Sequence, residues 1–89
     1  MNNKLILEAI ASDLKRVSLS LQRGSRGTAA RFAQEVMSKK DELDLSSLDA
    51  YVKKLISKLG QATKDPEDAL MYSTLLQNFA LRHYSLVSS

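Results

Sequence analysis

The sequence predicts an all-α fold, a four-helix bundle whose neighbouring helices run antiparallel, up-down-up-down. Apolar residues recur at spacings of three and four along four segments, and no segment alternates apolar and polar residues with period two. The three glycines and the single proline punctuate the chain between these segments. Connections of about four to six residues favour antiparallel neighbours. We therefore expect a single helical domain over residues 1–89, with helices at residues 3–22, 28–40, 47–59 and 66–86.

The first two predicted helices flank a glycine-rich turn. The stripe of the first helix consists of Ile6, Ile10, Leu14, Val17 and Leu21. Gly24 is expected to end this helix, because glycine adopts the left-handed conformation without steric cost. Thr28 is the expected N-cap of the second helix. The apolar face of the second helix consists of Phe32, Ala33, Val36 and Met37.

The third and fourth predicted helices carry clear capping signals. Ser46 and Asp49 resemble a capping box before the third helix, and Gly60 is expected to end that helix. The stripe of the third helix consists of Leu48, Tyr51, Val52, Leu55, Ile56 and Leu59. Asp65 as N-cap and Pro66 at the first position predict the start of the fourth helix. The core face of the fourth helix consists of Tyr72, Leu75, Leu76, Phe79 and Ala80.

Composition excludes several classes of function. The chain has 89 residues, a formal net charge of +3 and no cysteine. It therefore lacks disulfides, thiolate metal sites and a cysteine nucleophile, and it fits a cytoplasmic location. Glu8 and Asp13 interrupt the apolar run near the N-terminus, so we expect no signal peptide. No stretch approaches the roughly 18 apolar residues of a membrane span, so we expect no membrane partner.

No combination of residues points to catalysis, so we expect no enzymatic activity, no cofactor and no metal site. His83 is the single histidine and lies beside the apolar stripe of the fourth helix, where packing is the expected role. A di-iron bundle would need a glutamate three residues before a histidine, and His83 has none. Glu35 is expected to pair with Lys39 or Arg31 on the surface of the second helix.

The segment RGSRGTAAR, from Arg23 to Arg31, is the main candidate for ligand binding. Arg23, Arg26, Thr28 and Arg31 surround a helix N-terminus, where unpaired N–H groups and the helix dipole favour an anion or a nucleic-acid phosphate. A tight, solvated turn would have the same composition, and the spacing of a P-loop is missing. Because acids cluster between residues 41 and 49, we expect the bundle to carry its basic and acidic groups at opposite ends.

The fourth predicted helix has more apolar residues than one buried stripe requires. Leu70, Met71, Leu81 and Tyr84 lie outside or at the edge of its main face. Either a wide stripe faces two neighbouring helices, or a protein partner or a second copy in a homodimer covers these residues. The first helix shows a smaller excess at Leu5, Ile6 and Leu19. The leading hypothesis is a protein-interaction domain that either self-associates or binds a partner helix, through the fourth helix and the first. The alternative is anion or nucleic-acid binding at Arg23–Arg31.

Overall fold

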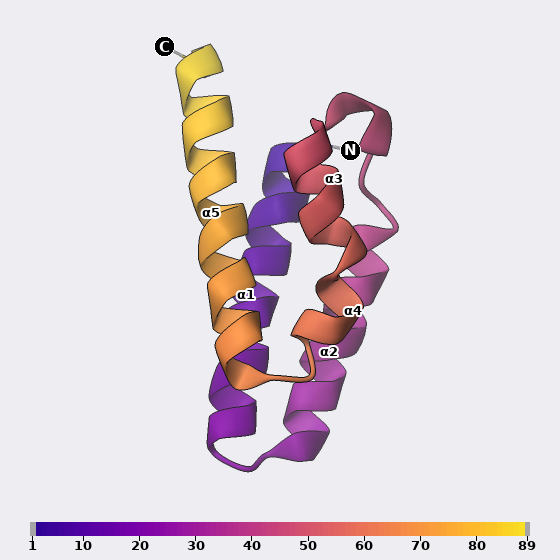
Figure 1. Cartoon of the computed structure of the whole chain (residues 1–89), viewed down its shortest axis with the longest axis vertical. Coiled ribbons are helices and arrows are strands. Elements are labelled where there is room, and N and C mark those ends of the chain that lie inside the picture. The colour runs from indigo at the N-terminus through magenta and orange to yellow at the C-terminus, as the bar shows by residue number, and fades with distance from the viewer. Residues whose placement is uncertain (1, 89) are drawn as a thin grey trace.

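The computed structural model describes the backbone of residues 2–88 and the side chains of residues 2–83. The prediction of an all-α chain is confirmed, because no residue within 2–88 lies in a strand (Figure 1). The α-helices are α1 (Asn3–Gln22), α2 (Arg26–Lys40), α3 (Ala50–Ser57), α4 (Leu59–Ala62) and α5 (Pro66–Ser88), and Leu45–Ser47 form the 3₁₀-helix η1. The fold is compact, with a radius of gyration of 12.6 Å.

Helix α1 is the centre of the packing. It contacts α2 along one side and α5 along the other, and α4 contacts both α2 and α5. In Figure 1, α3 and α4 lie between α5 and α2. The side chains with no solvent exposure come from all of these helices and form one core: Leu7, Ile10, Leu14, Val17, Val36, Val52, Leu59, Ala69, Leu76 and Ala80. This core follows the helical spacing of apolar residues in the sequence. Tyr51 is an exception: the spacing placed it on the stripe of the third helix, but its side chain is exposed.

The turn between α1 and α2 is a Schellman motif. The N–H of Ser25 donates to the carbonyl of Ser20 at 2.8 Å, and the N–H of Gly24 donates to the carbonyl of Leu21 at 3.1 Å. Gly24 has φ +76°, which confirms that it ends α1 in the left-handed conformation. Helix α2 begins at Arg26 with Ser25 as N-cap, so Thr28 lies inside the helix and is not the cap. The Schellman bonds fix the turn, and the helix restarts directly after it.

The structure divides the helix predicted over residues 47–59. Asp44 accepts hydrogen bonds from the hydroxyls of Ser46 and Ser47, which stabilises η1 instead of a capping box at Ser46. Asp49 then caps α3, because its carboxylate accepts a hydrogen bond from the N–H of Val52 at 3.0 Å. The chain bends at Lys58, and α4 follows. Gly60 therefore lies within α4 and does not end a helix, and the four-helix antiparallel bundle stays a prediction.

Helices α1 and α5 run antiparallel in a constant register. The hydroxyl of Ser73 donates to the carbonyl of Ala11 at 2.6 Å, and the hydroxyl of Ser18 donates to the carbonyl of Pro66 at 2.7 Å. Seven residues forward along α1 thus correspond to seven residues back along α5. The same register places residue 81 beside Asn3, where α1 begins. The last turns of α5 therefore extend beyond α1 (Figure 1). At a rise of 1.5 Å per residue, the extension from residue 81 to Ser88 is roughly 10 Å.

Candidate interaction surface

Exposed apolar side chains are concentrated on α1 and α5. In the part of the chain whose side chains are described, the large apolar residues that remain exposed are Leu5, Leu19, Leu45, Tyr51, Leu70, Met71 and Leu81. All but Leu45 and Tyr51 belong to the two helices that pack against each other. Exposed apolar side chains that gather on adjoining elements are typical of a surface that another molecule covers.

The structure brings together two of the four residues predicted for an interface on α5. Leu70 and Leu81 are 44% and 46% exposed. They are eleven residues apart, close to three full helical turns, so both project from one flank of α5. Met71 is also exposed but lies about 100° further round the helix, away from that flank. The side chain of Tyr84 lies outside the described residues.

The outer face of α1 adjoins this flank of α5. Leu5 is 62% exposed and Leu19 is 43% exposed, while Ile6 belongs to the core. A shallow groove joins the two helices, and residues of both helices line it, among them Ser12, Lys15, Leu70, Thr74 and Gln77. Leu5 and Leu19 were therefore correctly identified as excess apolar residues on the first helix, and Ile6 was not.

The opposite side of α1 carries a buried carboxylate that the sequence interpretation missed. Asp13 is 4% exposed and accepts a hydrogen bond from Lys39 Nζ at 2.6 Å and another from Arg16 at 3.1 Å. The Arg16 guanidinium lies 5.5 Å from the centre of the Phe32 ring, within cation–π range. One signal could have revealed Asp13: it follows Ile10 by three residues and precedes Val17 by four, on the buried stripe.

This network shifts the titration of one lysine. The hydrogen bond to Asp13 raises the pKa of Lys39 above its ordinary value, and the nearby carboxylates of Asp13 and Glu35 act in the same direction, while burial opposes them. Lys39 Nζ lies 3.8 Å from Glu35, which confirms the predicted pair. The charges between α1 and α2 are thus neutralised within the molecule, so this side of α1 is a structural contact.

The arginine-rich segment is exposed at the turn between α1 and α2. Arg23, Arg26, Thr28 and Arg31 are all exposed, at the turn and along the first turns of α2. The Schellman bonds engage the N–H groups of Gly24 and Ser25, whereas the Ser25 side chain makes no capping hydrogen bond to the first turn of α2. In Figure 1 this turn lies at the lower end of the molecule and the acidic segment 41–49 at the upper end, as the sequence indicates.

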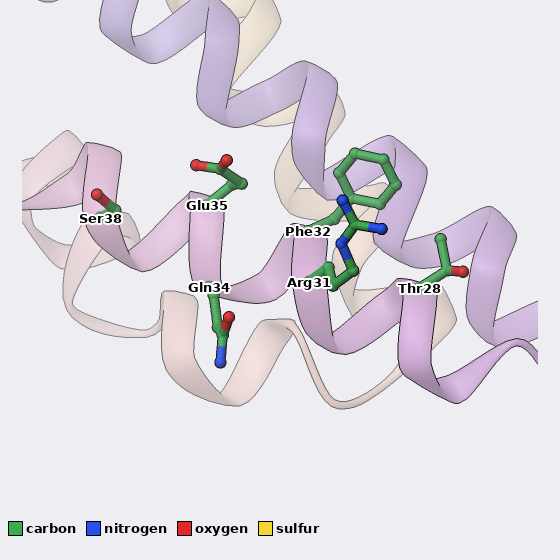
Figure 2. A pocket seen from close by; sticks show the side chains of 6 residues that line it. All are labelled: Thr28, Arg31, Phe32, Gln34, Glu35 and Ser38. Atoms are coloured by element: carbon green, nitrogen blue, oxygen red, sulfur yellow. The ribbon is translucent and has the colours of Figure 1, made fainter.

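A hollow along α2 includes two of the predicted anion-binding residues. Thr28 and Arg31 line it together with Phe32, Gln34, Glu35 and Ser38. Figure 2 shows Phe32 and Glu35 on the side of α2 that faces α1, and Gln34 on the opposite side. Its lining includes one basic and one acidic side chain, Arg31 and Glu35, and Glu35 lies 3.8 Å from Lys39 Nζ. Anion binding at Thr28 and Arg31 therefore stays a prediction.

The remaining chemical candidates do not assemble into a site. His83 is exposed and its ring stacks on Phe79 at 5.0 Å between ring centres. Within the described residues, no cluster of histidines and carboxylates could hold a metal ion, and no helix has the length and apolarity needed to cross a membrane. Comparison with protein-family models, with curated proteins and with solved structures finds no match.

Proposed function

We propose that the chain is a small non-enzymatic helical protein-interaction domain, which self-associates through α5 and the adjoining face of α1. The observation that carries the proposal is the exposure of Leu70 and Leu81 on one flank of α5, together with that of Leu5 and Leu19 on α1, the helix against which α5 packs. Full burial of a leucine side chain contributes about 1.5–3 kcal/mol, so covering four half-exposed leucines offers a substantial gain. The cost of association offsets much of it, so we expect a weak dimer with a dissociation constant of about 10–1,000 µM.

In this proposal α3 and α4 act as one bent rod of an antiparallel four-helix bundle. The antiparallel register of α1 with α5 and the tight turn between α1 and α2 support this arrangement. The bundle holds α1 and α5 side by side, so that their outer faces form one rigid platform. The absence of cysteine supports a cytoplasmic setting for it.

Sedimentation equilibrium from micromolar to millimolar concentration tests the proposal. The wild type is expected to self-associate, and the double variant Leu70→Gln, Leu81→Gln is expected to shift to monomer. Leu45→Gln is the matched control, because Leu45 is 47% exposed but lies on η1. Circular dichroism checks that each variant remains helical. A wild type that stays monomeric at millimolar concentration contradicts the proposal.

Anion or nucleic-acid binding through Arg23, Arg26 and Arg31 is the second candidate. The sequence between Asp13 and Glu35 has five basic residues and no acid, and these three arginines are exposed. Such a surface would bind a polyanion without sequence preference, and affinity would fall as salt rises. A salt titration of binding to single-stranded nucleic acid tests this candidate. The triple variant Arg23→Gln, Arg26→Gln, Arg31→Gln should lose binding, and a triple variant that binds as well as the wild type rules out this surface.

A further inference from the structure

We infer that the partner is a second copy of this chain, and that the two copies pair their α1 helices antiparallel about a twofold axis at Ser12. The inference rests on the proposed function and specifies its partner and register. The contact consists of a stripe along α1, here called the outer stripe: Leu5, Glu8, Ser12, Lys15 and Leu19.

The outer stripe has the geometry of a helix–helix seam. Its members are spaced by three, four, three and four residues, so they lie in one row along α1. The row is about 21 Å long, from the rise of 1.5 Å per residue. Leu5, Ser12, Lys15 and Leu19 are exposed and Glu8 is half-buried. Neither α2 nor α5 covers this row, since Asp13 faces α2 and Ala11 and Ser18 face α5.

The chemistry of the outer stripe is self-complementary in one direction only. Leu5 and Leu19 each lie seven residues from Ser12, so an antiparallel pair places Leu5 of each copy on Leu19 of the other. Glu8 lies four residues before Ser12 and Lys15 lies three residues after it. Each Glu8 therefore approaches Lys15 of the second copy, and symmetry provides this ion pair twice.

A parallel pair would oppose like charges. Glu8 would face Glu8 and Lys15 would face Lys15, which disfavours that direction. At the axis, the small side chain of Ser12 permits close approach of the two helices. Leu70 and Thr74 line the groove beside Ser12, so α5 borders the same contact and Leu70 adds apolar area to it.

Charge reversal tests the pairing. Glu8→Lys and Lys15→Glu should each raise the dissociation constant about tenfold, because each replaces two attractive pairs with two repulsive ones. The double variant restores both pairs and should return to the wild-type value. An equimolar mixture of the two single variants should form heterodimers, since every cross-pair is then attractive. Glu42→Lys and Lys53→Glu are the matched controls, with the same charge changes at exposed positions outside α1.

The outcomes separate this inference from the proposed function. Single variants that associate as well as their controls, or a double variant weaker than both singles, overturn the antiparallel pairing. If the Leu70→Gln, Leu81→Gln protein still loses association in that case, the proposed function stands with a different geometry. A wild type that remains monomeric overturns both, and sedimentation of the folded proteins at several salt concentrations provides the readout.

Discussion

The two sides of α1 hold the molecule together by different means. Toward α2, the contact includes a buried carboxylate, Asp13, which binds Lys39 and Arg16. Toward α5, hydroxyl groups of Ser18 and Ser73 donate to backbone carbonyls across the contact. The first contact depends on charge and therefore on pH. The second depends on small side chains that let the two helices lie close together.

The contact of α1 with α5 is bordered by an exposed leucine, Leu70. Small residues such as Ala11 and Ser73 fill the space between α1 and α5, and both are buried. Leu70, at the border of this contact, is 44% exposed and lines the groove between the two helices. The α2 side leaves charged groups at its border instead, and Arg16 there covers Phe32. The α5 side thus combines small buried residues with an exposed apolar border, and the α2 side combines a buried ion pair with a charged border.

The largest effect is expected from adding bulk between α1 and α5. Ser73→Leu should destabilise the fold by about 3 kcal/mol, because it forces two more non-hydrogen atoms into a buried site at the contact of α1 with α5. Ser73→Ala removes only the hydrogen bond to Ala11 and should cost about 1 kcal/mol. Urea denaturation measures both free energies of unfolding. Equal stability of the two variants would contradict the close contact of α1 with α5.

A smaller loss is expected when the charged contact is broken. Asp13→Ala should cost about 2 kcal/mol, because Lys39 and Arg16 lose their shared acceptor. Asp41→Ala, a change to an exposed acid at the end of α2, should lie within about 0.5 kcal/mol of the wild type. The same urea denaturation provides the measurement. An Asp13→Ala protein as stable as the Asp41→Ala control would show that the α2 contact does not depend on the carboxylate.

The smallest effect is a dependence on alkaline pH. The folded-state pKa of Lys39 is raised above its ordinary value of 10.5. The charged Lys39 side chain therefore contributes its full share to the free energy of unfolding below the unfolded-state pKa. That contribution is lost as pH rises through the folded-state pKa. Lys39→Met lacks this titration, so the difference in unfolding free energy between it and the wild type should narrow above pH 10.5. A difference that stays constant from neutral to alkaline pH would exclude this linkage.

Local signals predict the long helices well. Helix α1 has the predicted bounds, and α5 begins at Pro66 with Asp65 as a cap, since the Asp65 carboxylate accepts a hydrogen bond from the N–H of Asp68 at 2.9 Å. The division of the third helix could not be predicted in the same way, because Asp44, Ser46 and Asp49 are all suitable caps. A contact distant in sequence favours Asp44: Asn3 makes two hydrogen bonds with its backbone, 41 residues away.

The candidate surface was predictable in part. A helix that has more apolar residues than one buried stripe needs must expose the extra ones unless a neighbour covers them. This reasoning correctly predicted that Leu70 and Leu81 lie outside the core. The role of Asp13 was missed, because burial of a carboxylate depends on Lys39, which lies 26 residues away on another helix. The sequence alone likewise could not identify the outer stripe of α1, because the exposure of this row depends on where α2 and α5 pack against that helix.

Disulfide cross-linking tests the antiparallel pairing of α1 most directly, because the natural chain has no cysteine. Proteins with Leu5→Cys or Leu19→Cys are oxidised separately and as an equimolar mixture. The account predicts a cross-linked heterodimer in the mixture and little dimer in either protein alone, because equivalent positions lie roughly 20 Å apart in the antiparallel pair, far beyond the reach of a disulfide. Efficient cross-linking of the Leu5→Cys protein with itself, or none in the mixture, would contradict it.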